Sequence, residues 1–171
     1  MSWLNDDLGT SVAAIWGNRL KTLPPEQVHP GLSAPTREFL TTVGLPTVQV
    51  GAFTPLPDSG VLSSEHVGDR EYVPVINGLP NDFRFAVEVG SDEVFCLFDG
   101  STEVYLANSN LGLFVMFVGR YYRDLWTLAE PNVQSVNPAV GAIVESLMTI
   151  DPPALDTSAW WTTFLGQALE V

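Results

Sequence analysis

The stretch Phe98-Asp99-Gly100-Ser101-Thr102-Glu103-Val104-Tyr105-Leu106-Ala107-Asn108-Ser109-Asn110-Leu111-Gly112-Leu113-Phe114-Val115 predicts a turn, a strand and a capped helix in direct succession. Asp99-Gly100 between apolar runs is typical of a tight β-turn, and Val104–Leu106 has the pattern of a strand. Ser109 is a candidate N-cap for a helix that runs to about residue 128. The helix is indicated by apolar residues at Leu111, Phe114, Val115, Val118, Tyr122 and Leu125. None of these residues is a catalytic group, so function is expected on a surface.

Upstream of this stretch the apolar residues change to a period of two, which predicts the rest of a sheet. Residues 72–76 form one short strand. In residues 83–89 apolar side chains alternate with Arg84, Ala86 and Glu88, which predicts a strand with these three residues on a solvent-exposed face. Residues 94–98 are apolar at every position, which predicts a central strand covered by helices or loops on both sides. With a turn at residues 90–92, these strands form a consecutive antiparallel meander.

Helical signals lie at both ends of the chain. The clearest helix begins at Ser33 or Pro35 and ends before Gly44. Other helices are expected at about residues 3–16, 138–148 and 158–169. A mainly antiparallel central sheet flanked by N-terminal and C-terminal helices is an α+β fold, and residues 1–171 are expected to form a single domain.

The composition indicates a folded and strongly acidic protein. The 171 residues are 46% hydrophobic and 11% aromatic, which excludes a disordered chain. With 20 acidic against 7 basic residues, a net charge of −13 and a pI of about 4.2, the chain is expected to avoid nucleic acid and anionic membranes and to favour a basic partner. The start of the chain lacks signal-peptide features and there is a single cysteine, so the cytoplasm is the expected location. The oligomeric state is left open.

Few groups are available for catalysis or metal binding. His29 lies in a proline-rich connector, where a solvated loop histidine is expected, and His66 has only carboxylates near it, with no second His or Cys to close a metal site. Cys96 is expected in the core, where burial raises its pKa. Helical spacing also assigns an aromatic set mainly to the core: Phe114, Phe117, Tyr121, Tyr122 and Trp126. Because no catalytic motif is present, no catalytic residue, metal or cofactor is predicted, and an enzyme is not expected.

Acidic residues concentrate between Asp82 and Glu103, where six acids face Arg84 alone, a local balance of −5. One interpretation is that they keep loop tips and a sheet face soluble. The other is a negative patch that meets the cationic face of a partner. The six predicted partner-binding residues are Asp92, Glu93, Asp99 and Glu103 near the hairpin turns, with Asp69 and Glu71 from the preceding loop. Asp58 and Glu65 of the same loop would extend this patch.

Four groups of residues, taken in their order and spacing, resemble a known family. They are Thr36–Leu40 running into Gly44–Pro46, Phe98–Gly100 followed by Val104-Tyr105, Asn108–Leu111 leading to Phe114-Val115, and Asp151-Pro152 with Ala154-Leu155 before Trp160-Trp161. Together they resemble the SUKH superfamily of bacterial toxin-immunity proteins, most closely its fourth family, which is frequent in actinobacterial genomes.

This resemblance implies a SUKH-like fold and an immunity protein that neutralises a cognate polymorphic toxin by stoichiometric binding. Such toxins are often nucleases or nucleic-acid deaminases, and the acidic composition is compatible with a basic target of that kind. The alternative is an intracellular adaptor or regulatory scaffold with the same fold. A toxin gene beside this one would favour the first hypothesis.

Overall fold

The protein is a curved antiparallel sheet with helices on one face. The computed structural model describes residues 2–57, 60–80, 82–124 and 136–169. The helices are α1 (Asp6–Trp16), α2 (Ala34–Thr42), α3 (Leu111–Asp124), α4 (Val136–Ile150) and α5 (Trp160–Leu169), with 3-10 turns η1 (Gly17–Arg19), η2 (Pro25–Gln27) and η4 (Pro152–Leu155). The strands are β1 (Leu20–Lys21), β2 (Leu45–Pro46), β3 (Phe53–Pro55), β4 (Glu65–Val67), β5 (Arg70–Gly78), β6 (Phe83–Glu88), β7 (Val94–Phe98) and β8 (Val104–Asn108).

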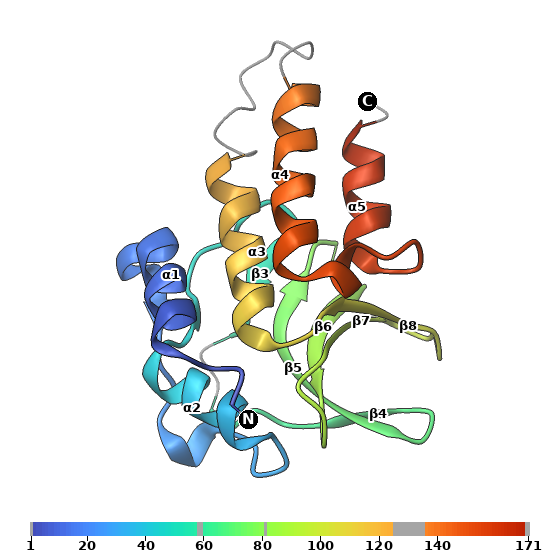
Figure 1. Cartoon of the computed structure of the whole chain (residues 1–171). Helices are drawn as coiled ribbons and strands as arrows, with labels where there is room; N and C mark the ends of the chain where they lie inside the picture. Colours follow the sequence, from blue (N-terminus) through green and yellow to red (C-terminus); the bar gives the residue numbers. More distant parts are fainter. Residues whose placement is uncertain (1, 58–59, 81, 125–135, 170–171) are drawn as a thin grey trace.

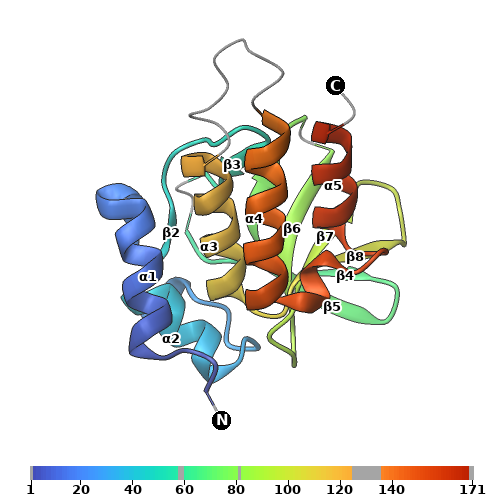
Figure 2. The ribbon, with the colours of Figure 1, turned by 45° about the horizontal axis from the view of Figure 1, so that its top comes forward.

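The C-terminal helices form one layer over the sheet. Helices α3, α4 and α5 stand side by side above the strands, and α1 packs against α3 (Figure 1). The same layer lies in front of the strands when the molecule is turned (Figure 2). Helices at both ends of the chain with a sheet between them confirm the α+β prediction. Within the described ranges, no helix is both long and apolar enough to cross a bilayer.

The main sheet contains the predicted meander. Its strand order is β3-β5-β6-β7-β8, all neighbours are antiparallel, and β4 pairs with β5. The Asp99-Gly100 turn between β7 and β8 is confirmed: the Ser101 amide donates to the Phe98 carbonyl at 3.2 Å, and Gly100 has a φ of 73°. The segment before β5 was expected to be a loop. It instead contains β4, which forms a short hairpin with β5, so the sheet has an additional strand there.

Helix α2 follows the local sequence signals closely. The Ser33 hydroxyl accepts a hydrogen bond from the Thr36 amide at 3.2 Å and caps the helix, and Pro35 lies in the first turn. Gly44 ends it with a φ of 92°, and a Cβ there would lie 2.2 Å from the carbonyl oxygen of Lys21. Glycine is therefore required at this position both for its backbone conformation and for space.

The predicted cap of α3 is wrong by one residue. Asn110, not Ser109, is the N-cap, because its side-chain oxygen accepts the Leu113 amide at 2.9 Å. Ser109 instead donates its hydroxyl to Asp151 at 2.6 Å. The expected end of this helix at about residue 128 and the aromatic Trp126 lie outside the described residues. Helices α4 and α5 match the predicted helices within two residues at each end.

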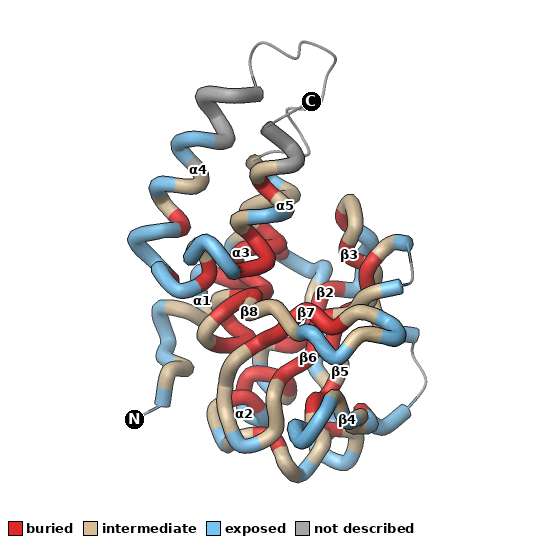
Figure 3. Tube along the Cα trace, turned by 90° about the vertical axis from the view of Figure 1, so that its right-hand side faces the viewer, coloured by how far each residue is buried: buried red, intermediate tan, exposed pale blue. Residues whose placement is uncertain are grey.

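The main core lies between the sheet and the helix layer. Val94 and Cys96 of β7 are completely buried, as predicted, and Phe98 at the end of the strand is half-buried. Phe114 and Phe117 are also buried, whereas Tyr121 and Tyr122 from the same predicted aromatic set are half-buried. The tube in Figure 3 shows this burial along β6, β7 and α3. The core assignment of the central strand is confirmed.

The face of the sheet opposite the helices is not the wet face that the alternation in β6 predicted. Ala86 is completely buried in a second apolar cluster, and the Arg84 and Glu88 side chains retain only 22% and 14% of their exposure. The other buried members of this cluster are Tyr72, Phe95 and Leu97. Curvature of the sheet and the β4–β5 hairpin bring these residues together. A period of two in one strand cannot report such a contact, because its partners come from other strands.

Candidate functional site

The six predicted partner-binding acids lie at opposite ends of the sheet. Because β6 runs antiparallel to both β5 and β7, the turns at its two ends are separated by its whole length, about 17 Å at 3.3 Å per residue. One group, here called the Asp92 end, comprises Asp69, Glu71, Glu88, Asp92 and Glu93. The other, here called the Glu103 end, comprises Asp82, Asp99 and Glu103. The acidic window is thus continuous in sequence but divided in space.

At the Asp92 end, the carboxylate of Asp92 contacts the start of α2. One of its oxygens accepts hydrogen bonds from the Ser33 hydroxyl and, at 3.1 Å, from the Thr36 hydroxyl. A negative charge at a helix N-terminus also interacts favourably with the helix dipole. Asp92 therefore ties the β6–β7 turn to α2, in addition to any contact it makes with a partner.

Glu71 at the same end is also held within the protein. It accepts the Ser64 hydroxyl, and its carboxylate lies 3.9 Å from Nε2 of His29. The His29 side chain is only 20% exposed, and its Nδ1 accepts the Gly31 amide at 3.1 Å. The prediction of a solvated loop histidine is thus wrong, because folding brings β5 against the connector that carries His29.

Two other predicted acids have no such ties. Asp69 is exposed at the turn between β4 and β5, and Glu93 is half-buried after the β6–β7 turn. Neither side chain forms a hydrogen bond or ion pair with another described residue. Asp58 lies outside the described residues. Asp69 and Glu93 are therefore the carboxylates of the Asp92 end that an external cation can approach without breaking an internal contact.

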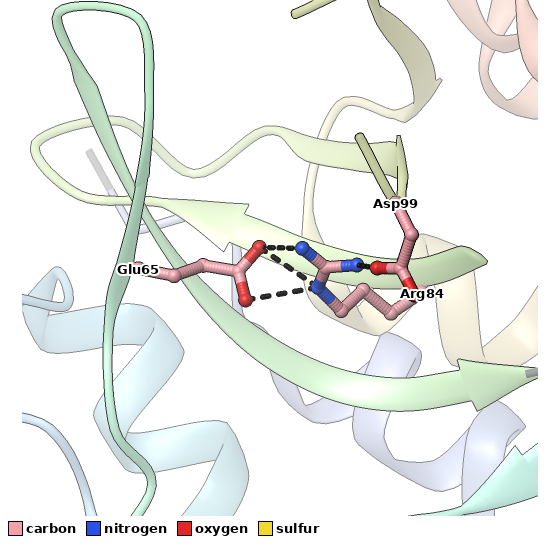
Figure 4. Close-up of polar contacts among 3 residues, drawn as sticks. All are labelled: Glu65, Arg84 and Asp99. Carbon is pink, nitrogen blue, oxygen red and sulfur yellow. Dashed lines mark hydrogen bonds and ion pairs between the residues drawn. The ribbon is translucent and has the colours of Figure 1, made fainter. Parts of the chain in front are cut away.

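Arg84 is the cation within the acidic window, and it joins three strands of the sheet. Its Nε donates to both carboxylate oxygens of Glu65 at 2.8 and 2.9 Å, and Nη1 pairs with Asp99 (Figure 4). The hydrogen bonds with Glu65 raise the pKa of Arg84 above its ordinary value. Glu65 lies on β4, Arg84 on β6 and Asp99 just after β7, so this cluster closes the helix-free face.

Glu103 is an exposed carboxylate of the Glu103 end with a defined orientation. It accepts a hydrogen bond from the Tyr105 hydroxyl at 2.8 Å. This bond raises the pKa of the Tyr105 phenol. Asp82 and Asp99, both exposed, are joined through their backbones, since the Asp99 amide donates to the Asp82 carbonyl at 2.8 Å. The Glu103 end thus presents three acids on ordered backbone.

A buried polar network explains several residues on which the family resemblance rests. Asp151 is 2% exposed and accepts hydrogen bonds from the Asn108 amide group, the Ser109 backbone amide and the Ser109 hydroxyl, at 2.6 to 3.0 Å. The Asn108 side-chain oxygen accepts the Trp161 indole at 2.9 Å. The network joins the end of β8 to the end of α4 and the start of α5. Its role is structural.

No candidate for metal or nucleophilic chemistry emerges from the described part of the chain. It contains no group of three His, Cys, Asp or Glu side chains placed to hold a metal ion. His66, which pairs with Glu71 across β4 and β5, is exposed. Burial raises the pKa of the Cys96 thiol well above its ordinary value, which withholds the reactive thiolate.

The curved sheet beneath a layer of helices, with helices at both ends of the chain, places the protein in the α+β class. Within that class, the chain belongs to the SUKH-4 immunity protein family, whose family model matches residues 8–167. Neither a curated protein nor a solved structure matches the chain. The matched range includes all four groups of motif residues. Membership of this family indicates an immunity role and, in general terms, a toxin as the partner.

Proposed function

We propose that this protein neutralises a cognate toxin by stoichiometric binding in the cytoplasm, acting as a single domain and without chemistry of its own. The observation that carries the proposal is the match of the immunity-family model to residues 8–167. The proposed toxin is a basic domain that acts on nucleic acid, a nuclease or a deaminase. An inhibitor of this kind requires affinity and slow dissociation only.

The charge of the protein supports a basic target. A net charge of −13 creates a negative field that accelerates encounter with a cationic surface and disfavours acidic competitors. The proposed contact residues are the six acids at the two ends of the sheet. Asp69, Glu93 and Glu103 contribute directly, whereas Asp92, Glu71 and Asp99 also hold α2, the connector and Arg84 in place.

The experiment is to express the toxin domain encoded beside this gene, with and without this protein, and to measure cell survival and the association rate at two salt concentrations. A variant with Asp69→Asn, Glu93→Gln and Glu103→Gln is expected to associate about tenfold more slowly at low salt, with a flatter salt dependence. Asp92 and Asp99 are left intact because their loss would weaken α2 and the Arg84 cluster, respectively.

A matched control carries Asp6→Asn, Glu26→Gln and Glu145→Gln, three exposed acids on α1, η2 and α4. It has the same net charge as the test variant. Equal slowing of both variants would show that net charge alone matters and would reject the proposed contact residues. Failure of the wild type to bind or protect would reject the immunity function, and binding of an unrelated intracellular protein without protection would favour an adaptor.

A further inference from the structure

A groove of about 610 Å³ opens between α5 and the Glu103 end of the sheet. Its sheet wall is formed by Phe83 of β6, Phe98 of β7 and Tyr105 of β8, and its helix wall by Trp160 and Phe164 of α5. Phe83, Phe98, Tyr105 and Phe164 are half-buried, so part of each ring still faces solvent. A concave surface made mostly of aromatic rings is typical of a binding site rather than of an ordinary solvated face.

The rings of the groove hold one another in place. Phe83 and Phe98 are cross-strand partners with centroids 5.8 Å apart, and Phe98 meets Tyr105 edge-on at 5.8 Å. On the helix wall, Trp160 and Phe164 stack at 4.5 Å. Because each wall is anchored in a strand or helix, the groove is formed before any partner arrives. Binding there loses little conformational freedom on this side of the interface.

The mouth of the groove is negatively charged. Glu103 is one of its lining residues and is oriented by Tyr105, and Asp82 and Asp99 lie at the same end of the sheet. None of the lining residues is Lys or Arg. Arg84, the basic residue between Asp82 and Glu103 in the sequence, is already paired with Glu65 and Asp99. An apolar floor with an uncompensated carboxylate at its rim matches a ligand that is apolar at its tip and cationic beside it.

We propose that this groove is the anchor site for the toxin, and that it receives one large apolar side chain from a basic segment whose adjacent Arg or Lys pairs with Glu103. The proposal rests on the proposed immunity function and adds where and how the partner is held. Buried aromatic centres with a polar rim carry most of the energy in protein interfaces. The anchor therefore sets the dissociation rate, and Glu103 contributes to both capture and orientation.

Thr163→Trp tests the groove without removing a core side chain. Thr163 is exposed on α5 and lines the groove, so an indole there fills the space that the toxin side chain would occupy. Thr149→Trp, at an exposed position on α4, is the matched control. With an inactive form of the toxin domain encoded beside this gene as the probe, Thr163→Trp is expected to raise the dissociation rate at least 100-fold, and Thr149→Trp to leave it unchanged.

Glu103→Arg, a change of an exposed side chain, provides a second variant in case Thr163→Trp fails to fold. It is expected to weaken binding at least tenfold, and hydrogen exchange should slow at residues 99–103 in the wild-type complex. If both variants fold and both bind the toxin with wild-type affinity, the groove proposal is overturned. If Thr163→Trp does not fold, wild-type affinity of Glu103→Arg is enough to overturn it. A self-associated wild type that Thr163→Trp converts to a monomer would assign the groove to a second copy and also overturn it. Absence of wild-type binding would instead reject the immunity function itself.

Discussion

Asp151 illustrates what a single residue does in this protein. Its buried carboxylate accepts three hydrogen bonds from the donors of Asn108 and Ser109, and no Lys, Arg or His among the described residues forms an ion pair with it. The sequence motifs include Asn108 and Ser109 in one group and Asp151 in another. The motifs could not show that these residues meet, because their contact depends on how α3 and α4 return to the sheet.

Asp151→Ala is expected to destabilise the fold by about 3 kcal/mol, since it leaves buried donors of Asn108 and Ser109 without an acceptor. Urea unfolding followed by circular dichroism measures the change. Asp156→Ala, a neighbouring acid that is exposed, is the control and should cost well under half as much. A similar midpoint for the two variants would argue against a structural role for the network.

The thiol of Cys96 and the phenols of Tyr72 and Tyr121 contribute to how the free energy of unfolding responds to alkali. Burial raises the pKa of all three above their ordinary values of 9.0 for Cys and 10.0 for Tyr. The folded state therefore holds these protons more tightly than the unfolded state. Their contribution is fully present below the unfolded pKa values and is lost progressively as pH rises toward the folded ones.

The free energy of unfolding is thus expected to be level near pH 8 and to fall above about pH 9, by up to about 1.4 kcal/mol per pH unit for each group. Cys96→Ala removes the earliest of these contributions. Urea unfolding at a series of pH values should show a shallower decline between pH 9 and 10 in this variant than in the wild type. Identical slopes would show that the buried thiol is not linked to stability.

At the scale of elements, the predictions succeeded where the signals are local. Ser33, Pro35 and Gly44 act within their own turns, so the bounds of α2 could be predicted. The cap of α3 could not, because Ser109 and Asn110 are both capable N-caps and the choice depends on Asp151, which lies 42 residues away from Ser109. The covered second face of β6 depends on other strands in the same way.

Arg84 is expected to hold the β4–β5 hairpin against β6. Arg84→Gln removes its ion pairs with Glu65 and Asp99, and should destabilise the protein by about 1 kcal/mol, since both pairs are partly solvent-exposed. Hydrogen exchange should accelerate in residues 64–72 while α3 remains protected. Arg37→Gln, at an exposed position on α2, is the control. Unchanged exchange in the hairpin would mean that packing alone closes this face.

At the scale of the whole molecule, the sequence predicts the sign of the charge but not its distribution. The acids between Asp82 and Glu103 are close along the chain, yet the alternation of antiparallel strands sends them to two ends of the sheet. The aromatic groove was not predicted at all. Its rings are spread along the chain from Phe83 to Phe164, and each lies in an apolar pattern that is typical of ordinary core residues.

The central claim is that one molecule of this protein inactivates one molecule of toxin. The most direct measurement is a titration of the activity of the toxin domain encoded beside this gene with increasing amounts of the purified protein. Activity is predicted to fall in a straight line and to reach its minimum at one molar equivalent. Undiminished activity beyond one equivalent, or complete loss at a small fraction of an equivalent, would contradict stoichiometric neutralisation.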